Sequence, residues 1–447
     1  MRLLPQGSTS ITARLQKDYC SKVSGSKGVI LWCCCLIVFV CAGMVGVGED
    51  SRYVRRADKA FALEDFTLAA QLYARAIAVN PANAQANYKL GYCYLELHQP
   101  KMAKVYLKKA QELNPASTDG LLLLYLAEAH HQDYDFEQAR SYYQQEMRNT
   151  PRTDWVYIQF LQKRMDECAA GAMLVMKPSV AQVVNLGAGI NTASAEYGPV
   201  LMPGDQTMLY TFRKARKAKN GLPLKEEHIR ASALQSGEWQ KSKPLQGLPQ
   251  EQGAVVGTAA QGQELYTFFA GRGLHRSNWQ GEAWSLPLRL EKPFNEGDLE
   301  PSLFVTGDGR FAFFSSNRDG GYGGLDLYVC ARQADGSWGK ALNLGPAVNT
   351  AFDEDAPFVD SETNTLYFSS LGHNTMGGYD IFRSSLVRGE WSPAQNLGYP
   401  INSPHDDVYF TLSHDRGTAY FSSDRPGGFG AKDLYRVILL SQVSAEK

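Results

Sequence analysis

Five carboxylates recur at matching places in the C-terminal part of this chain, and they are the residues best placed to do chemistry. Each lies three residues before an aligned position of a predicted strand, once per repeat of a pattern described below: Glu196, Glu251, Asp298, Glu354 and Asp406. If those strands line a central channel, the carboxylates form a ring that attracts cations, calcium among them, or basic peptides. The alternative is that each carboxylate caps a local turn or pairs with an arginine of its own repeat.

Other candidate metal and catalytic groups are weak. Gly320 to Gly323 and Gly427 to Gly430 resemble calcium-binding nonapeptides, but such nonapeptides need tandem copies that share ions. The eight histidines are scattered, and the cysteines beyond residue 41 have no zinc spacing, so no metal cluster and no resident cofactor are expected. Nucleophile-elbow, zinc-helix and phosphate-loop motifs are absent, and no catalytic residue is predicted.

A short run of cations is the remaining charged feature. Five basic residues lie within the segment Arg213 to Lys219, which we expect to be a loop inserted between strands. This loop could contact an anionic partner, although a solvated loop is the simpler interpretation. The formal net charge of -1 gives no general attraction to nucleic acid, so no nucleic-acid partner is expected.

The elements that position the five carboxylates are predicted to be strands. Beyond Pro178, short apolar alternations are separated by Asp-Gly and Gly-Gly turns. Phe-Ser-Ser triplets beginning at Phe314, Phe368 and Phe421 recur at steps of 54 and 53 residues. Five copies of about four strands each predict a five-bladed β-propeller over residues 183–440, followed by a tail over 441–447. The segment Val183 to Leu186 would close the ring by pairing with the last copy.

A helical array is predicted before the propeller. Helical spacing begins near residue 50, and the stops at Asn80-Pro81 and Asn114-Pro115 lie 34 residues apart. This pattern resembles the tetratricopeptide repeat, which implies an all-α solenoid over residues 50–170 with a closing helix, then a linker over 171–182. The resemblance further implies a concave groove for peptides or protein helices, lined by Val54, Asp58, Tyr88, Tyr92, Leu124, Glu128 and His131.

The propeller repeat also resembles a known type. Phe421 to Gly428, followed by Asp433-Leu434-Tyr435, is similar to the TolB-type, WD40-like repeat, and Arg318 and Arg425 match its arginine. Tetratricopeptide units before such a propeller resemble the N-terminal half of OmpA-family outer-membrane and type IX secretion-associated proteins of Bacteroidetes. The resemblance covers residues 50–440 and does not extend to the OmpA-like domain of those proteins.

The N-terminal segment, residues 1–48, is predicted to direct export. Residues 28–48 form an uncharged and mostly apolar run that follows several basic residues. A cleaved signal peptide, an uncleaved membrane anchor and a lipoprotein signal all remain open. In each case we expect a periplasmic or outer-membrane-associated protein that touches the membrane only through this segment.

Together these features predict a scaffold or adaptor rather than an enzyme. The expected partners are envelope proteins or peptides, in a secretion, gliding or outer-membrane assembly. One alternative is a carbohydrate-active or hydrolytic propeller enzyme, since Ser413 to Thr418 resembles the Asp-box turn of sialidases. The other is a module that binds glycans or calcium without turnover.

Overall fold

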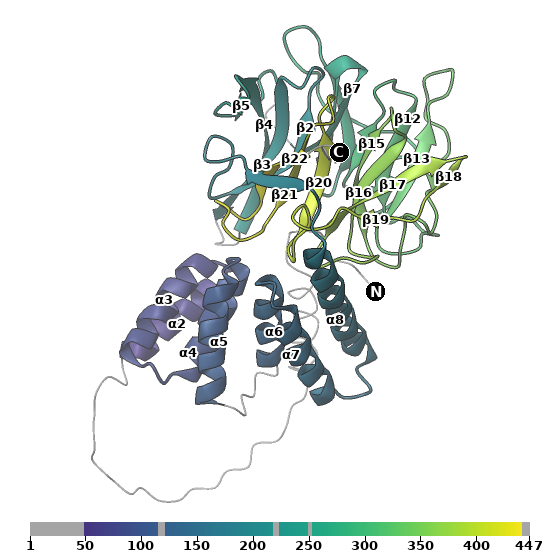
Figure 1. The fold of residues 1–447 in the computed structure, drawn as a ribbon. Helices are drawn as coiled ribbons and strands as arrows, with labels where there is room; N and C mark the ends of the chain where they lie inside the picture. Colours follow the sequence, from purple (N-terminus) through teal and green to yellow (C-terminus); the bar gives the residue numbers. More distant parts are fainter. Residues whose placement is uncertain (1–48, 115–120, 218–222, 249–252, 440–447) are drawn as a thin grey trace, which may run out of the picture.

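The protein consists of a helical array packed against a five-bladed β-propeller, as Figure 1 shows. The computed structural model describes residues 49–114, 121–217, 223–248 and 253–439. The predicted export segment 1–48, Glu251, Lys219 and the tail 441–447 therefore lie outside the described residues. Within the described ranges, no helix has both the length and the apolar character that a bilayer crossing requires. The architecture confirms the fold class expected from the sequence.

Seven helices make up the described part of the array. They form three antiparallel pairs and a closing helix: α2 (Glu49–Ala62) with α3 (Phe66–Val79), α4 (Ala84–Glu96) with α5 (Pro100–Leu113), α6 (Leu122–Gln132) with α7 (Phe136–Asn149), and then α8 (Trp155–Met176). Asp65, Asn83, Asp135 and Asp154 cap four of these helices by accepting a backbone N–H from the first turn. The second helix of each pair carries alanines with no exposed surface: Ala69 and Ala76 in α3, Ala103 in α5 and Ala139 in α7.

The closing helix is longer than predicted. Residues 171–176 were expected to belong to a linker, but α8 continues to Met176. The segment is rich in strong helix formers, and Lys177-Pro178 stops it because the residue before proline disfavours the helical conformation. Gly171 is needed inside the helix, because a Cβ there would lie 2.6 Å from the Phe136 ring.

Five antiparallel sheets form the propeller blades. Blades 1 and 2 contain β2 (Ala195–Leu201), β3 (Thr207–Lys217), β4 (Pro223–Gln235), β5 (Glu238–Trp239) and β6 (Lys243–Pro244), then β7 (Ala254–Ala259), β8 (Glu264–Phe269), β9 (Gly273–Asn278) and β10 (Leu288–Arg289). Blade 3 contains β11 (Leu303–Val305), β12 (Phe311–Ser316), β13 (Asp326–Ala331) and β14 (Leu342–Asn343). Blade 4 contains β15 (Glu354–Asp360), β16 (Thr365–Ser370), β17 (Asp380–Val387), β18 (Glu390–Trp391) and β19 (Gln395–Asn396).

The last blade is closed by the first strand of the domain. It contains β20 (Asp407–Leu412), β21 (Thr418–Ser423), β22 (Asp433–Leu439) and β1 (Ala181–Asn185). β1 runs antiparallel to β22, with Val183 opposite Val437, and the Leu186 N–H donates to the Leu434 carbonyl over 3.0 Å. The predicted closure of the ring is confirmed, and it covers an edge of β22 that would otherwise be unpaired.

The Phe-Ser-Ser triplets supply the core of three blades. Phe314, Phe368 and Phe421 are fully buried and stack on an aromatic residue of the neighbouring strand, with ring centroids 5.6 to 5.9 Å apart. Such cross-strand pairs stabilise a sheet beyond the burial of their area. The two serines that follow are buried too, and one of them holds the carboxylate described next.

Candidate functional site

Two of the predicted ring carboxylates are buried turn caps. Glu354 has no exposed surface; its Oε2 accepts the Thr350 N–H over 2.7 Å, and its Oε1 accepts the Thr350 and Ser370 hydroxyls. Glu196 makes the same two bonds to Thr192, four residues before it. Burial raises the pKa of each carboxyl to about 7, although these hydrogen bonds oppose the shift.

The structural equivalents in two other blades are not the residues we predicted. Glu300 replaces Asp298, and Asp407 replaces Asp406. These equivalents are buried and pair with the arginines of the repeat, Glu300 with Arg318 at 2.8 Å and Asp407 with Arg425 at 2.5 Å. The prediction assumed loops of equal length, whereas the shared feature is a carboxylate that receives amides of the preceding turn.

Asp298 and Asp406 therefore do not share a ring with Glu196 and Glu354. Asp298 is exposed. Asp406 accepts Lys432 Nζ at 2.9 Å and the Tyr379 N–H at 3.1 Å. The four described members play different local roles, as turn caps, as a solvent-facing side chain and as an ion-pair partner.

The glycine-rich loops are also held by carboxylates. Asp326 accepts the Tyr322 and Gly323 amides, and Asp433 accepts the Phe429 and Gly430 amides, at 2.6 to 3.1 Å. A cross-strand asparagine completes each network, Asn343 in blade 3 and Asn185 in blade 5. The Asp-box-like segment is a hairpin turn between β20 and β21, in which Ser413 Oγ donates to Asp415.

The basic run lies mainly in a strand rather than in an inserted loop. Arg213 to Lys217 belong to β3, which pairs with β4 in a long hairpin. The register puts Arg213 opposite Glu227 and Lys214 opposite Glu226, and opposite charges across a strand pair favour this extension. Arg213 also lies over the Tyr197 ring, 5.1 Å from its centroid.

The predicted groove residues are largely enclosed. Val54 and Asp58 are half-buried, whereas the other five have at most 9 % exposure: Tyr88, Tyr92, Leu124, Glu128 and His131. Glu128 receives a bidentate pair from Arg164 of α8, at 2.9 and 2.7 Å. Helix α8 thus covers this position of the third repeat, and partner binding by these residues stays a prediction.

The propeller covers the same end of the array. His131 Nε2 lies 2.8 Å from the Met376 carbonyl, and Met376 is fully buried among residues of the array. Tyr134 meets Tyr399 edge-on at 5.8 Å, and Lys163 lies over the Phe352 ring at 4.8 Å. Figure 1 shows the loops of the propeller facing the array. The third repeat and α8 are therefore a docking surface for blades 4 and 5.

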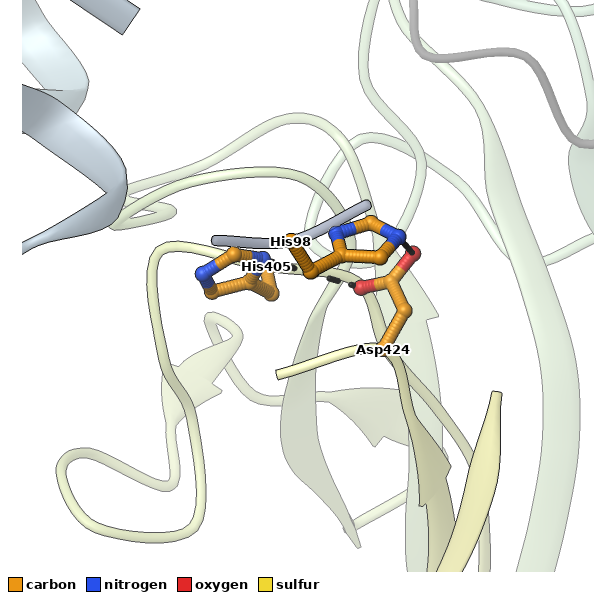
Figure 2. A group of neighbouring side chains, drawn as sticks. All are labelled: His98, His405 and Asp424. Carbon is orange, nitrogen blue, oxygen red and sulfur yellow. Dashed lines mark ion pairs between the residues drawn. The ribbon is translucent and has the colours of Figure 1, made fainter. Parts of the chain in front are cut away.

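A group of two histidines and one aspartate lies at this junction (Figure 2). His98 follows α4 in the array, whereas His405 precedes β20 and Asp424 follows β21 in the propeller. His98 Nε2 and His405 Nδ1 each lie 4.0 Å from a different oxygen of the Asp424 carboxylate. The sequence did not reveal this group, because His98 and the other two residues come from different domains and no repeat relates them.

The charge state of this group follows from its burial. Burial, aided by His98, lowers the pKa of His405 to about 3, so this imidazole is neutral at physiological pH. Burial alone would raise the pKa of Asp424, but the charge of Lys432 is the main factor that holds it low, at about 2. Lys432 Nζ lies 3.2 Å from the same carboxylate.

Part of the helical array matches a known family. Residues 60–119 match a family model described as a tetratricopeptide repeat. Arabidopsis OM64 has a similar tetratricopeptide domain, with 19% identity and a TM-score of 0.24 over 26% of this chain and 96% of that chain.

The propeller is similar to an endo-arabinase from Bacteroides thetaiotaomicron, with 14% identity and a TM-score of 0.39 over 56% of this chain and 96% of that chain. A Trypanosoma rangeli sialidase is 10% identical, with a TM-score of 0.35 over 59% of each chain. No curated protein matches the chain. The family match and the sheet topology show that the chain combines tetratricopeptide repeats with a five-bladed β-propeller.

Proposed function

We propose that this protein is a non-enzymatic scaffold of the cell envelope that binds protein or peptide partners through its helical repeats. The observation that carries the proposal is the tetratricopeptide match over residues 60–119 together with the stacked helix pairs. Such repeats act by presenting extended surfaces for binding. The basic and then apolar N-terminal sequence supports export, and a place in a secretion, gliding or outer-membrane assembly is part of the proposal.

The first two repeats are the part of the array on which we place the partner. Val54 is half-buried, and beside it the Asp58 carboxylate accepts the Tyr73 hydroxyl and Lys89 Nζ at 2.6 and 2.7 Å. The Asp58 and Lys89 side chains keep 40% and 25% of their surface exposed. An apolar side chain next to an accessible ion pair suits a peptide that buries one side chain and hydrogen-bonds through its backbone.

Three carboxylates lie near the Tyr379 side chain, those of Asp353, Asp355 and Asp406. Their contacts support a non-enzymatic role. Asp355 accepts the Ser315 hydroxyl, Asp353 accepts the Tyr379 hydroxyl, and Asp406 accepts Lys432 Nζ. A glycosidase needs one carboxyl group free to donate a proton and another free to act as base or nucleophile. Groups committed to structural bonds are poorly suited to either task, and we expect no turnover of glycosides or peptides by the purified protein. Measured turnover would contradict this part of the proposal.

The binding surface can be tested by affinity purification from membranes with mass spectrometry. We expect Val54→Glu to lose most of the co-purified envelope protein, because the substitution puts a charge into the contact. Val105→Glu is the matched control, since Val105 is 58% exposed on α5. Truncating Tyr88 or Tyr92 would be less informative, because both rings pack inside the array. Equal recovery with both glutamate variants would contradict the placement of the partner.

A further inference from the structure

We propose that His98, His405 and Asp424 form a site for a divalent transition metal such as zinc, which links the helical array to the propeller. Two imidazoles and a carboxylate are a donor set that zinc accepts, with a fourth position left for water. In the described part of the chain, this is the one group of three potential ligands whose donor atoms lie within 4.8 Å of one another. Neither domain contains the complete set.

The contacts of the two imidazoles with Asp424 favour a bound metal ion. The nitrogens that face Asp424 are 4.0 Å from its oxygens, which is beyond hydrogen-bonding distance. Buried polar groups are nearly always satisfied, so a pair of imidazoles and a carboxylate separated in this way needs an explanation. A metal ion among them provides one.

The three donor atoms need to move only a short distance towards one another to bind a metal ion. Ligands at about 2.05 Å in a tetrahedral zinc site lie about 3.3 Å from each other, so the donor atoms must approach by an ångström or so. His98 belongs to a short turn between α4 and α5, and its side chain is 28% exposed. That exposure provides both an entry path for the ion and the freedom to move.

Lys432 provides a counter-charge for the Asp424 carboxylate. Its Nζ lies 3.2 Å from Asp424 and 2.9 Å from Asp406, so it keeps the Asp406 carboxylate as a partner when Asp424 turns to the metal. The Asp406 N–H donates to Asp424 Oδ1 over 2.9 Å and orients the carboxylate, as the surroundings of metal ligands commonly do. A nearby cation opposes a second one, so we expect Lys432 to weaken binding of the metal.

Zinc titration of the full-length protein by calorimetry tests the site. His98→Asn removes the imidazole and preserves the turn, because His98 has φ +52° and asparagine tolerates this left-handed conformation. We expect the variant to bind one zinc equivalent fewer than the wild type, and zinc to raise the melting temperature of the wild type only. His414→Asn is the matched control, because His414 is exposed in a turn outside the site. The N-terminal cysteines are present in all three proteins and cancel in the comparison.

Two outcomes would overturn the proposal. One is a wild type that binds no more zinc than His98→Asn. This result is decisive as long as the wild type folds, whether or not the variant does. The other is an equal loss of binding in His414→Asn, which would identify adventitious surface binding. We expect Val54→Glu to lose the partner and to bind as much zinc as the wild type. The two proposals can therefore fail independently.

Discussion

Glu354 shows how a carboxylate that recurs in several repeats serves the fold rather than a channel. The side chain lies under a turn, accepts three hydrogen bonds and has a pKa of about 7 because of its burial. The unfolded chain ionises the same group near 4.5. The folded protein therefore holds the proton more tightly, and the contribution of Glu354 to stability declines as pH rises from 4.5 to about 7.

Glu354→Gln should remove that decline. The amide can face the Thr350 N–H with its oxygen and the two hydroxyls with its NH2 group, so the bonds survive without the charge. We expect the variant to be no more stable than the wild type at pH 5 and more stable at pH 8, a relative gain on the order of 2–3 kcal/mol. Thermal unfolding at both pH values measures it. Glu390→Gln, at an exposed glutamate, should show no such crossover, and a wild-type-like pH profile for Glu354→Gln would contradict the argument.

The position of the acidic residues could be predicted from the sequence only in part. Glu196 and Glu354 were found by alignment to the inner strands, whereas Glu300 and Asp407 were missed by two residues and one residue. The alignment used strand positions, but the preceding turn determines which carboxylate is enclosed. A spacing of four residues after Thr192, Thr350 and Ser403 was the available signal.

At the scale of elements, repeats made most of the fold predictable. Prolines 34 residues apart indicated the helix pairs, and the recurring Phe-Ser-Ser triplets indicated the blades. Both signals arise because each unit buries the same face against its neighbour. The C-terminal turns of α8 had no counterpart in the repeats. Their course depends on contacts with Phe136 and Met376, which lie elsewhere in the sequence.

The closing strand makes a prediction about these elements. Val184 lies two residues before Leu186, whose N–H donates to β22, so its own N–H points to the same side. Val184→Pro removes this donor from the middle of the ladder, and we expect the melting temperature of the propeller to fall by several degrees. Val180→Pro, before β1 begins, should have a much smaller effect. Equal melting temperatures for the two variants would show that closure by β1 contributes little.

At the scale of the whole molecule, the array and the propeller share a core that neither repeat pattern encodes. Met376 belongs to a propeller loop, yet its side chain is fully buried in a cluster whose other buried members all come from the array. Its carbonyl accepts the bond from His131, which is also fully buried. Burial lowers the pKa of His131 far below its usual value, so this contact is made by a neutral imidazole that donates its proton.

Met376→Asp should undock the two domains and leave each folded. An unpaired carboxylate costs several kcal/mol when buried, but it costs little if the loop becomes exposed to water. We therefore expect the wild type to unfold in one thermal transition and Met376→Asp in two, with a larger radius of gyration from small-angle X-ray scattering for the variant. Met376→Leu keeps the apolar volume and should retain one transition and the compact dimensions. One transition with unchanged dimensions in Met376→Asp would mean that other contacts, such as Tyr134 with Tyr399 and Lys163 with Phe352, hold the domains together without this side chain.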